Sequence, residues 1–322
     1  MPHRLLLVLV LLFSPVALGE SAWPTKPIRM IVPFAPGGAS DFAARLLAPR
    51  LGEVLGQQVI VDNRAGASGN IGMELAARSP PDGHTLFLGN IGTIAINPAV
   101  FRDLAVDPQK DLVAVTLVAE TPSILVAHPG VAAGSALDLV RLAKARPGAL
   151  NFASPGSSTL NRLEMERFMA ANDIRIVHVP YKGGAGPAVT GLLGGDVQVM
   201  FVTLSSALAF VQAGRLKALG ITTASRLEAL PQVPTLVEQG FADMVSSSWQ
   251  GVFGPAGTPR AVVEKLHDAL ATVLGAREMQ QRFVAGGAYV VTSRTPEEFA
   301  AFVAAEGQRW GRVAKETGAT VD

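Results

Sequence analysis

WPTKPIRMIVPFAPGGASD, residues 23–41, joins the pattern of a buried strand to a glycine turn and the start of a helix. The largely apolar run Ile28–Val32 is typical of a strand that is covered on both faces of a parallel sheet. Pro33 and Pro36 end that run, and apolar residues at helical spacing follow over residues 41–55. The stretch therefore predicts the first strand and the first helix of an α/β sheet.

The glycine turn of this stretch has the features of an anion site. Gly37 and Gly38 allow a sharp turn and the close approach of a ligand, because they carry no Cβ atom. Ser40 or Asp41 is expected to cap the helix that follows. A helix start presents unpaired N–H groups and the positive end of a dipole, which attract a small carboxylate. On this ground alone, a ligand site and an ordinary strand–turn–helix junction are equally consistent with the sequence.

The same alternation of strands and helices continues along the chain. The order strand–helix–strand–helix–strand in the first part implies parallel pairing with right-handed crossovers, and a second unit repeats the plan. The predicted strands are residues 28–33, 59–62, 85–89, 112–119, 123–128, 151–154, 176–179, 197–202 and 217–222. The predicted helices are residues 41–55, 71–78, 137–145, 160–172, 185–193, 206–213, 258–274 and 296–317.

The expected fold class is α/β, with two lobes that are each a mostly parallel sheet flanked by helices. A mature chain of ~300 residues exceeds one comfortable hydrophobic core, which also favours two lobes. We expect lobe 1 to comprise residues 20–122 and 252–322 and lobe 2 to comprise residues 123–251, with hinge crossings near 120–125 and 246–253. Two crossings make a hinged clamshell, or Venus flytrap, whose cleft lies at the carboxyl ends of the strands.

The first residues have the pattern of a cleaved secretory signal peptide, residues 1–19. Arg4 precedes the apolar run Leu5–Phe13, and Ala17–Gly19 is a cleavage site of small residues. The apolar run is too short for a stable membrane anchor, and an uncleaved anchor is the alternative to cleavage. The expected location of the mature chain is the periplasm.

The composition and the motif search exclude several classes of function. The chain has no cysteine, which excludes disulfides, thiolate metal sites and thiol catalysis. Its formal net charge is +1 and it has no basic block, so nucleic acid is not an expected partner. The sequence contains no Gly-x-Ser-x-Gly, no P-loop and no pair of histidines at metal-ligand spacing. We expect no metal, no cofactor and no catalytic residue; a triad assembled in space around Ser154 is the alternative.

Several motifs at fixed spacing resemble one family over nearly the whole chain. The opening stretch is followed by VIVDNRAGASGNIG at 59–72, PPDGHTL at 80–86, NFASPG at 151–156, VPYKGGAGPAVTGLLGGDVQVMF at 179–201 and GVFGPAGTP at 251–259. Together they resemble the Bug family, the substrate-binding proteins of tripartite tricarboxylate transporters. The resemblance implies a two-domain periplasmic binding protein, not an enzyme, that is a monomer.

The resemblance also implies which residues of the first glycine turn contact a ligand. Phe34, Ala35, Gly37 and Gly38 match the family loop that touches the ligand carboxylate, mostly through backbone atoms and bridging water. Asp41 matches the helix-start aspartate of the family. We interpret Asp41 as a cap that fixes the loop rather than as a direct contact.

A second glycine turn, residues 66–72, is predicted to line the cleft through Gly69. Its spacing imitates a dinucleotide-binding fingerprint, but it follows the second strand of the lobe and no acidic residue ends a following strand at the required distance. Asn63 and Arg64 are candidates for orienting this turn. A solvated surface position is almost as expected for Arg64, because most arginines are exposed.

In the second lobe, residues 154–162 place hydroxyl groups at a helix start. Ser154, Ser157, Ser158 and Thr159 are candidates for hydrogen bonds to a carboxylate across the cleft, and helix capping is their structural alternative.

The chain departs from the family pattern at two positions of this segment. The family has glycine and histidine where this chain has Ser158 and Arg162. Arg162 is a permanent cation suited to bidentate carboxylate binding, which predicts a dicarboxylate or an otherwise more anionic ligand. The alternative is a solvent-facing pair with Glu166, one helical turn along.

The last candidate segment is VPYKGGAGPA, residues 179–188. Tyr181 is expected to line the cleft, and Gly183 and Gly184 are expected to present N–H groups. Lys182 is either a ligand charge or a surface lysine.

These observations predict an extracytoplasmic solute receptor. It would capture a small carboxylate between two lobes through glycine-loop and helix N-terminal N–H groups, and deliver it to the membrane subunits of a tripartite tricarboxylate-type transporter. A periplasmic sensing receptor is the first alternative, and a periplasmic hydrolase on the same fold is the second. The identity of the ligand is not encoded, because contacts through backbone and water leave little side-chain code.

Overall fold

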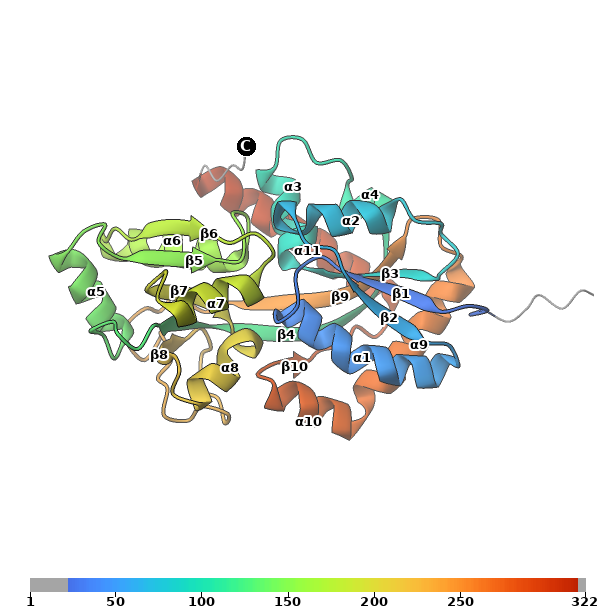
Figure 1. The fold of residues 1–322 in the computed structure, drawn as a ribbon. Coiled ribbons are helices and arrows are strands. Elements are labelled where there is room, and N and C mark those ends of the chain that lie inside the picture. The colour runs from blue at the N-terminus through green and yellow to red at the C-terminus, as the bar shows by residue number, and fades with distance from the viewer. Residues whose placement is uncertain (1–22, 318–322) are drawn as a thin grey trace, which may run out of the picture.

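A computed structural model describes residues 23–317 (Figure 1). The predicted signal peptide, residues 1–19, lies outside the described residues. Two α/β lobes, at the left and right of Figure 1, are joined by the long strands β4 (Leu112–Ala127) and β9 (Ser247–Pro255), which run through the middle of the molecule. The expected α/β fold class is confirmed.

The right-hand lobe is built from the predicted strand–helix–strand–helix–strand unit. Its elements are β1 (Ile28–Val32), α1 (Ala39–Leu55), β2 (Val59–Asn63), the short 3₁₀ helix η1 (Ala67–Gly69), α2 (Asn70–Ala77) and β3 (Thr85–Asn90). β1 pairs in parallel with both β2 and β3, which confirms the predicted pairing.

The start of α1 corrects one prediction. Neither Ser40 nor Asp41 is the N-cap residue, because α1 begins at Ala39 and follows Gly38, which has no side chain with which to cap it. The Asp41 carboxylate instead accepts a hydrogen bond from the Gly37 N–H at 3.0 Å. This bond folds the loop back onto the first helical turn, which is the loop-fixing role that the sequence suggests for Asp41.

After β3 the chain forms three elements that hydrophobic periodicity does not reveal. They are the π-helix η2 (Gly92–Ile96), α3 (Asn97–Val100) and α4 (Pro108–Asp111). All residues of η2 are buried. A segment without a polar face shows no helical period in its sequence, so η2 has no pattern by which to be recognised.

β4 corrects the largest error in the predicted elements. The sequence predicts two strands separated by residues 120–122, whereas the structure has one strand of 16 residues that includes Pro122. Residues up to Pro122 pair with β9, and residues after it pair with β7 (Val199–Thr203) and β8 (Lys217–Ile221). The missing N–H of proline therefore falls where the strand changes partners, which a strand tolerates.

The left-hand lobe repeats the α/β plan within about two residues of each predicted boundary. In chain order its further elements are α5 (Ala136–Ala145), β5 (Asn151–Ser154), α6 (Leu160–Asn172), β6 (Val177–Pro180), α7 (Ala185–Gly194) and α8 (Leu204–Gln212). β5 pairs in parallel with both β6 and β7.

A single sheet runs through both lobes in the order β2-β1-β3-β9-β4-β7-β5-β6. The outer strands of each lobe are parallel, as predicted, but β9 is antiparallel to β3 and β4, and β4 is antiparallel to β7 and β8. β10 (Tyr289–Val290), which was not predicted, adds to the edge of β4. The shared central strands mean that the lobes cannot move apart without bending β4 and β9.

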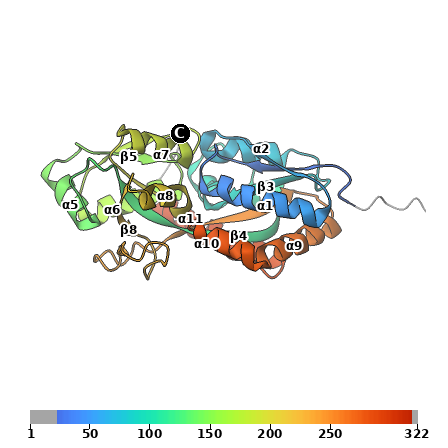
Figure 2. The ribbon, with the colours of Figure 1, turned by 60° about the horizontal axis from the view of Figure 1, so that its bottom comes forward.

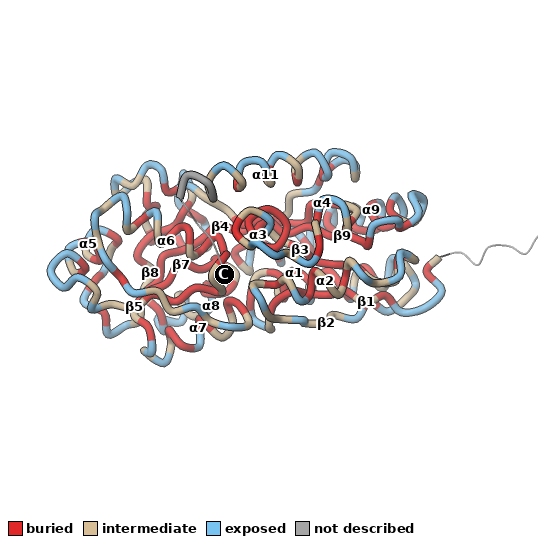
Figure 3. The backbone as a smooth tube through the Cα atoms, turned by 90° about the horizontal axis from the view of Figure 1, so that it is seen from above, coloured by how far each residue is buried: buried red, intermediate tan, exposed pale blue. Residues whose placement is uncertain are grey.

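The C-terminal helices cover the right-hand lobe and the junction. α9 (Arg260–Gly275) and the unpredicted α10 (Arg277–Ala285) pack against α1, while α11 (Pro296–Thr317) packs against η2, α3 and β4. Figure 2 shows α7 and α8 of one lobe facing α1 of the other, and Figure 3 shows α11 along one side of the molecule. Within the described residues, no helix combines the length and the apolar character that a membrane crossing requires.

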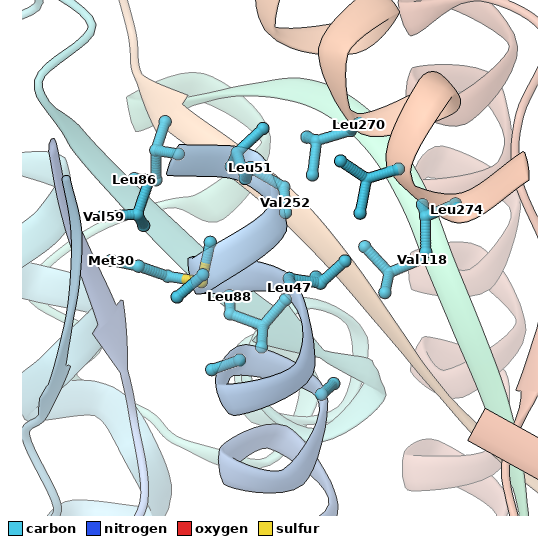
Figure 4. Close-up of a cluster of buried hydrophobic side chains, with 14 of the residues drawn as sticks. Met30, Leu47, Leu51, Val59, Leu86, Leu88, Val118, Val252, Leu270 and Leu274 are labelled. Carbon is cyan, nitrogen blue, oxygen red and sulfur yellow. The ribbon is translucent and has the colours of Figure 1, made fainter. Parts of the chain in front are cut away.

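One hydrophobic core holds α1 in place (Figure 4). Leu47 and Leu51 of α1 pack with Met30 of β1, Leu88 of β3 and Leu270 of α9, and all five side chains are fully buried. Burial of each such side chain contributes about 1.5–3 kcal/mol. The N-terminus of α1 is thereby held rigidly at the junction between the lobes.

Candidate ligand site

A cavity of about 50 Å³ lies between the two lobes. Its wall is formed by the loop between β1 and α1, the end of β3, the starts of α6, α7 and α8, and β9. The lining residues are Phe34, Gly38, Ala39, Ser40, Asn90, Ile91, Gly92, Pro155, Thr159, Leu160, Asn161, Ala185, Thr203, Ser248 and Gln250. None of these lining residues is Asp, Glu, Lys, Arg or His. An anion held here would therefore depend on hydrogen bonds from uncharged donors.

Four helix N-termini meet at this cavity. The residues that precede α1, α6, α7 and α8 are Gly38, Thr159, Gly184 and Thr203, and none of them caps its helix through a side-chain hydrogen bond. The N–H groups of each first turn have no partner inside the helix. Together with the positive ends of four helix dipoles, these groups make the cavity a site for an anion.

Gln250 of β9 adds a side-chain donor to the cavity wall. Its side chain is 1% exposed, and its Oε1 accepts a hydrogen bond from the Thr121 Oγ1 at 3.5 Å. Its Nε2 is buried and has no hydrogen-bond partner among the described residues. Because buried polar atoms are nearly always paired, this N–H₂ group is a candidate donor to a molecule in the cavity.

The first glycine loop is held by a partly buried polar cluster behind it. Asn63 Nδ2 donates to the carbonyl oxygen of Phe34 at 2.8 Å and to Asp41 Oδ1 at 3.1 Å. Arg45 Nε donates to Asp41 Oδ2 at 2.9 Å. Burial opposes ionisation of Asp41, but hydrogen bonds from Arg45, Gly37 and Asn63 outweigh it and hold the pKa of Asp41 below its usual value. The sequence assigns Asn63 to the second glycine turn, whereas its amide supports the first.

Contacts between the lobes close the cleft over the cavity. The Ala35 N–H donates to the Gly183 carbonyl oxygen at 2.7 Å, and Ser158 Oγ donates to Asn97 Oδ1 at 2.6 Å. Gly186 lies so close to the first loop that a Cβ atom on it would be 2.2 Å from the Pro36 carbonyl oxygen. The two glycine loops therefore touch backbone to backbone.

The predicted residues of the first lobe divide into wall and support. Phe34 and Gly38 line the cavity, whereas Ala35 and Gly37 lie at the contact with the other lobe. Gly69 has a φ of +93°, and a Cβ atom there would be 2.5 Å from the Thr93 Cγ2 and 3.3 Å from the Phe34 ring. Gly69 thus packs behind Phe34 and supports the wall from outside. Direct ligand contact by any of these residues stays a prediction.

The predicted serine and threonine residues of the second lobe have different positions. Thr159 lines the cavity, and Ser158 makes the contact with Asn97. Ser154 is fully buried, with its Oγ 2.6 Å from His178 Nε2 and 2.9 Å from the Gly156 carbonyl oxygen. Burial, and then the charge of Arg162, lower the pKa of His178 to about 4.

Arg162 adopts the arrangement that the sequence offers as its alternative. Its Nε donates to Glu166 Oε1 at 2.7 Å, and its guanidinium also donates to the carbonyl oxygen of Ser157 at 2.6 Å. It does not belong to the cavity lining. With its donors directed at Glu166 and Ser157, Arg162 helps to hold the loop before α6, and its contact with a ligand stays a prediction.

The candidates of residues 179–188 also lie around the cavity rather than in it. Tyr181 packs against α7, where a Cβ on Gly191 would overlap its hydroxyl group, and Lys182 is exposed. Gly184 packs against Phe34, because a Cβ atom added to Gly184 would lie 3.0 Å from the Phe34 ring. The next residue, Ala185, is the one that reaches the cavity wall.

Several lining residues are not among those that the sequence predicts. Asn90 and Thr203 stand at the carboxyl ends of β3 and β7, a position that does predict ligand contact in α/β sheets. Ser248 and Gln250 lie within β9, and only the pairing of β9 with β3 and β4 brings them to the cavity. Among the described residues, no group of three or more His, Asp or Glu side chains is placed to hold a metal ion.

Comparisons with known proteins agree on one family. The model of the TctC family, described as the tripartite tricarboxylate transporter family receptor, matches residues 43–319. Protein BugT of Bordetella pertussis is 38% identical to this chain over 307 residues, covering 95% of this chain and 93% of BugT.

Two similar solved structures contain dicarboxylates. R. palustris Rpa4515 with adipate is 34% identical, with a TM-score of 0.89 over 93% of this chain and 100% of that chain. MatC from Rhodopseudomonas palustris with bound malate is 31% identical, with a TM-score of 0.85 over 90% of this chain and 99% of that chain.

Proposed function

This chain belongs to the TctC family of tripartite tricarboxylate transporter receptors, and we propose that it binds a small carboxylate in the cavity between its lobes. The family is one of periplasmic solute-binding receptors rather than of enzymes. The similar proteins that were solved with adipate and with malate support a small carboxylate as the ligand class.

The observation that carries the proposal is the meeting of four uncapped helix N-termini at a cavity without charged side chains. A negative charge at one helix N-terminus is stabilised by about 0.3–1 kcal/mol, and by up to ~2 kcal/mol when it is partly buried. Several such termini and the Gln250 N–H₂ group together favour a carboxylate strongly over its neutral amide. The cavity is small, so we propose that larger ligands bind as the lobes open.

A thermal-shift screen tests the ligand class. Mono-, di- and tricarboxylates, malate and adipate among them, would be compared with their neutral amides. A ligand at about 100 times its dissociation constant adds about 2.7 kcal/mol to the free energy of unfolding. We expect a clear rise in melting temperature for one class of acid and none for its amides. Equal shifts for an acid and its amide would contradict the proposal.

Ligand capture is proposed to involve closure of the two lobes about β4 and β9. We propose residues 20–122 and 252–322 as lobe 1 and residues 123–251 as lobe 2. The Ala35–Gly183 and Ser158–Asn97 contacts then lie between the two proposed lobes. Closure would surround the carboxylate with donors from both lobes and slow its loss. The closed receptor would then deliver the ligand to transporter membrane subunits. A sensing role is the alternative, and unimpaired uptake of the ligand after deletion of the protein would favour it.

One contact favours a second candidate function, a hydrolase. Ser154 Oγ lies 2.6 Å from His178 Nε2, as a nucleophile and its base do. However, Ser154 is fully buried, its hydroxyl donates to the Gly156 carbonyl oxygen, and neither Ser154 nor His178 lines the cavity. We therefore expect Ser154→Ala to leave ligand affinity nearly unchanged. Turnover of a small ester by the wild type that this substitution abolishes would establish the hydrolase instead.

A further inference from the structure

A buried carboxyl group lies next to the cavity wall. Glu164 of α6 is 2% exposed. Its Oε1 accepts a hydrogen bond from Ser246 Oγ at 2.5 Å, and its Oε2 accepts one from Asn161 Nδ2 at 3.0 Å. Asn161 belongs to the cavity lining, so one side chain separates Glu164 from the cavity.

The same cluster ties together the two segments where the chain passes between the lobes, at Ser123 of β4 and at Ser246 just before β9, and the end of β8. Asn161 Nδ2 also donates to Ser123 Oγ at 3.0 Å, and Ser123 directly follows the point where β4 changes partners. Thr222, at the end of β8, accepts from the Ser123 N–H at 2.9 Å and donates to the Ser246 carbonyl oxygen at 2.8 Å. Glu164 is therefore hydrogen-bonded to the crossing segments as well as to the cavity wall.

The hydrogen bonds of Asn161 determine what it offers to a ligand. Its two amide protons are used by Glu164 and Ser123, so only its carbonyl oxygen is available to the cavity. A carbonyl oxygen repels a carboxylate. If Glu164 gains a proton, its O–H can donate to Asn161 Oδ1, and the amide can turn to direct one N–H into the cavity.

We propose that Glu164 is a positioning residue that couples the binding of an anionic ligand to the uptake of one proton. This inference rests on the proposed carboxylate-binding function. The proton comes from solvent and stays on Glu164 while the ligand is bound. Ligand release from the receptor is accordingly favoured at higher pH.

Two physical effects support the coupling. Burial raises the pKa of Glu164 to about 7, against the hydrogen bonds of Ser246, Asn161 and Ser123 and the charge of Arg167, so its proton is exchanged near neutrality. A like charge nearby disfavours an ionised carboxyl group, so a bound carboxylate raises that pKa further. The turn of the Asn161 amide acts in the same direction.

The charged groups around Glu164 do not neutralise it. Arg167 of its own helix is exposed and donates to the Asp243 carbonyl oxygen at 2.8 Å. Glu120 of β4 and Glu306 and Arg309 of α11 line a groove together with Arg167 and Ser246. Among the described residues, no Lys, Arg or His forms an ion pair with Glu164. The lining of the cavity itself has no titratable side chain.

Isothermal titration calorimetry with malate and with adipate tests the coupling. If a bound carboxylate raises the pKa of Glu164 from about 7 to about 8, the dissociation constant at pH 8 is about fivefold higher than at pH 6, and binding at pH 7.5 takes up about half a proton. Proton uptake is measured by repeating the titration in buffers of different ionisation enthalpy. Both acids are fully ionised over most of this range, so the ligand contributes little.

Glu164→Gln imitates the protonated carboxyl group and is expected to bind equally well at both pH values, with no proton uptake. Glu264→Gln, an exposed change on α9, should retain the wild-type pH dependence. Wild-type binding that is independent of pH would overturn the coupling and leave the proposed function intact. A pH dependence of binding that persists in Glu164→Gln would also overturn the coupling. Absence of binding of any carboxylate at either pH would overturn the proposed function together with the coupling.

A variant that fails to fold does not prevent the test, because the wild type alone can be followed by infrared spectroscopy. A buried protonated carboxyl group gives a C=O band that disappears as pH rises through about 7, and ligand should move that loss to higher pH. A band whose midpoint is unaffected by a ligand that binds would overturn the proposal.

Discussion

Gln250 is the side chain that the proposed ligand is expected to affect most directly. Its Nε2 has no partner among the described residues, although it is buried in the wall of the cavity. A buried donor that is left without a partner costs about 1–3 kcal/mol. We therefore expect the ligand-free protein to be less stable than a form in which a carboxylate accepts this hydrogen bond.

Gln250→Met is predicted to affect stability and affinity in opposite directions. Methionine has a similar volume but no donor, and the hydrogen bond that it removes from the Thr121 hydroxyl group is long at 3.5 Å, so ligand-free protein should gain about 1 kcal/mol in its free energy of unfolding. The same change removes a hydrogen bond to the carboxylate, and the dissociation constant should rise about tenfold or more. Urea denaturation and calorimetry measure the two effects.

The exposed change Gln281→Met on α10 is the control for that experiment and should alter neither quantity. A Gln250→Met protein that loses stability and keeps its affinity would show that the amide serves packing rather than ligand binding.

At the residue scale, the sequence predicts the site only where the chemistry is local. Phe34, Gly38 and Thr159 belong to short motifs at helix starts, and all three line the cavity. Gln250 is far along the chain in a strand of ordinary composition, and it reaches the cavity through the pairing of β9. Arg162 shows the opposite case, because a long side chain has several partners in reach and the sequence cannot rank Glu166 against a ligand.

At the element scale, the start of α1 is supported by Asp41 rather than by a cap residue. The carboxylate receives hydrogen bonds from Gly37, Asn63 and Arg45 and therefore joins the loop, β2 and the helix. The N–H groups of the first turn stay free for a ligand because Asp41 binds the N–H of the preceding loop instead.

Asp41→Asn is predicted to destabilise the protein by about 2 kcal/mol near pH 7, the scale of hydrogen bonds to a charged group. The pKa of Asp41 is lowered in the folded protein. Its stabilisation is therefore present above the unfolded pKa of about 3.9 and is lost as pH falls through the folded pKa. The stability difference between wild type and variant, measured by urea denaturation, should be constant above pH 5 and shrink below pH 4.

Asp268→Asn, at a carboxylate that is 83% exposed, provides the matched control and should change stability little at any pH. A difference for Asp41→Asn that grows toward acid pH would contradict the assignment of an ionised, hydrogen-bonded Asp41.

Most helices and strands can be located from the sequence, because the spacing of apolar residues within each segment shows which of its faces is buried. The run at residues 28–32 and the helix at 160–172 are found within about a residue, since each has a clear apolar pattern and a terminating residue. β4 and η2 are not. Whether Pro122 ends a strand depends on where the partner strands change, and a wholly buried helix has no period to detect.

At the scale of the whole molecule, the two lobes approach each other closely at their glycine loops. A Cβ atom on Gly38 would lie 3.6 Å from the Ala185 Cβ across the junction. This separation suits a disulfide, and Gly38 has a φ of −96°, which any residue adopts. The chain has no cysteine of its own, so an introduced cysteine pair has no native thiol with which to pair wrongly.

The double variant Gly38→Cys with Ala185→Cys is predicted to lock the lobes closed when oxidised. Ligand loaded before oxidation should stay bound through hours of dialysis, whereas the reduced protein should release it on the time scale of lobe opening, seconds or less. Bound ligand is measured by mass spectrometry after dialysis. Equal release from the oxidised and the reduced protein would contradict closure at this junction.

The uncharged lining of the cavity has a consequence for how such a receptor diversifies. The groups proposed to attract the carboxylate belong to the main chain at four helix starts, and every substitution except one to proline leaves the main-chain N–H in place. An alanine scan would therefore underrate the anion-binding part of the cavity. Ser248 belongs to the side-chain part of the lining, and a single substitution there is expected to change which acid fits while the main-chain donors stay in place.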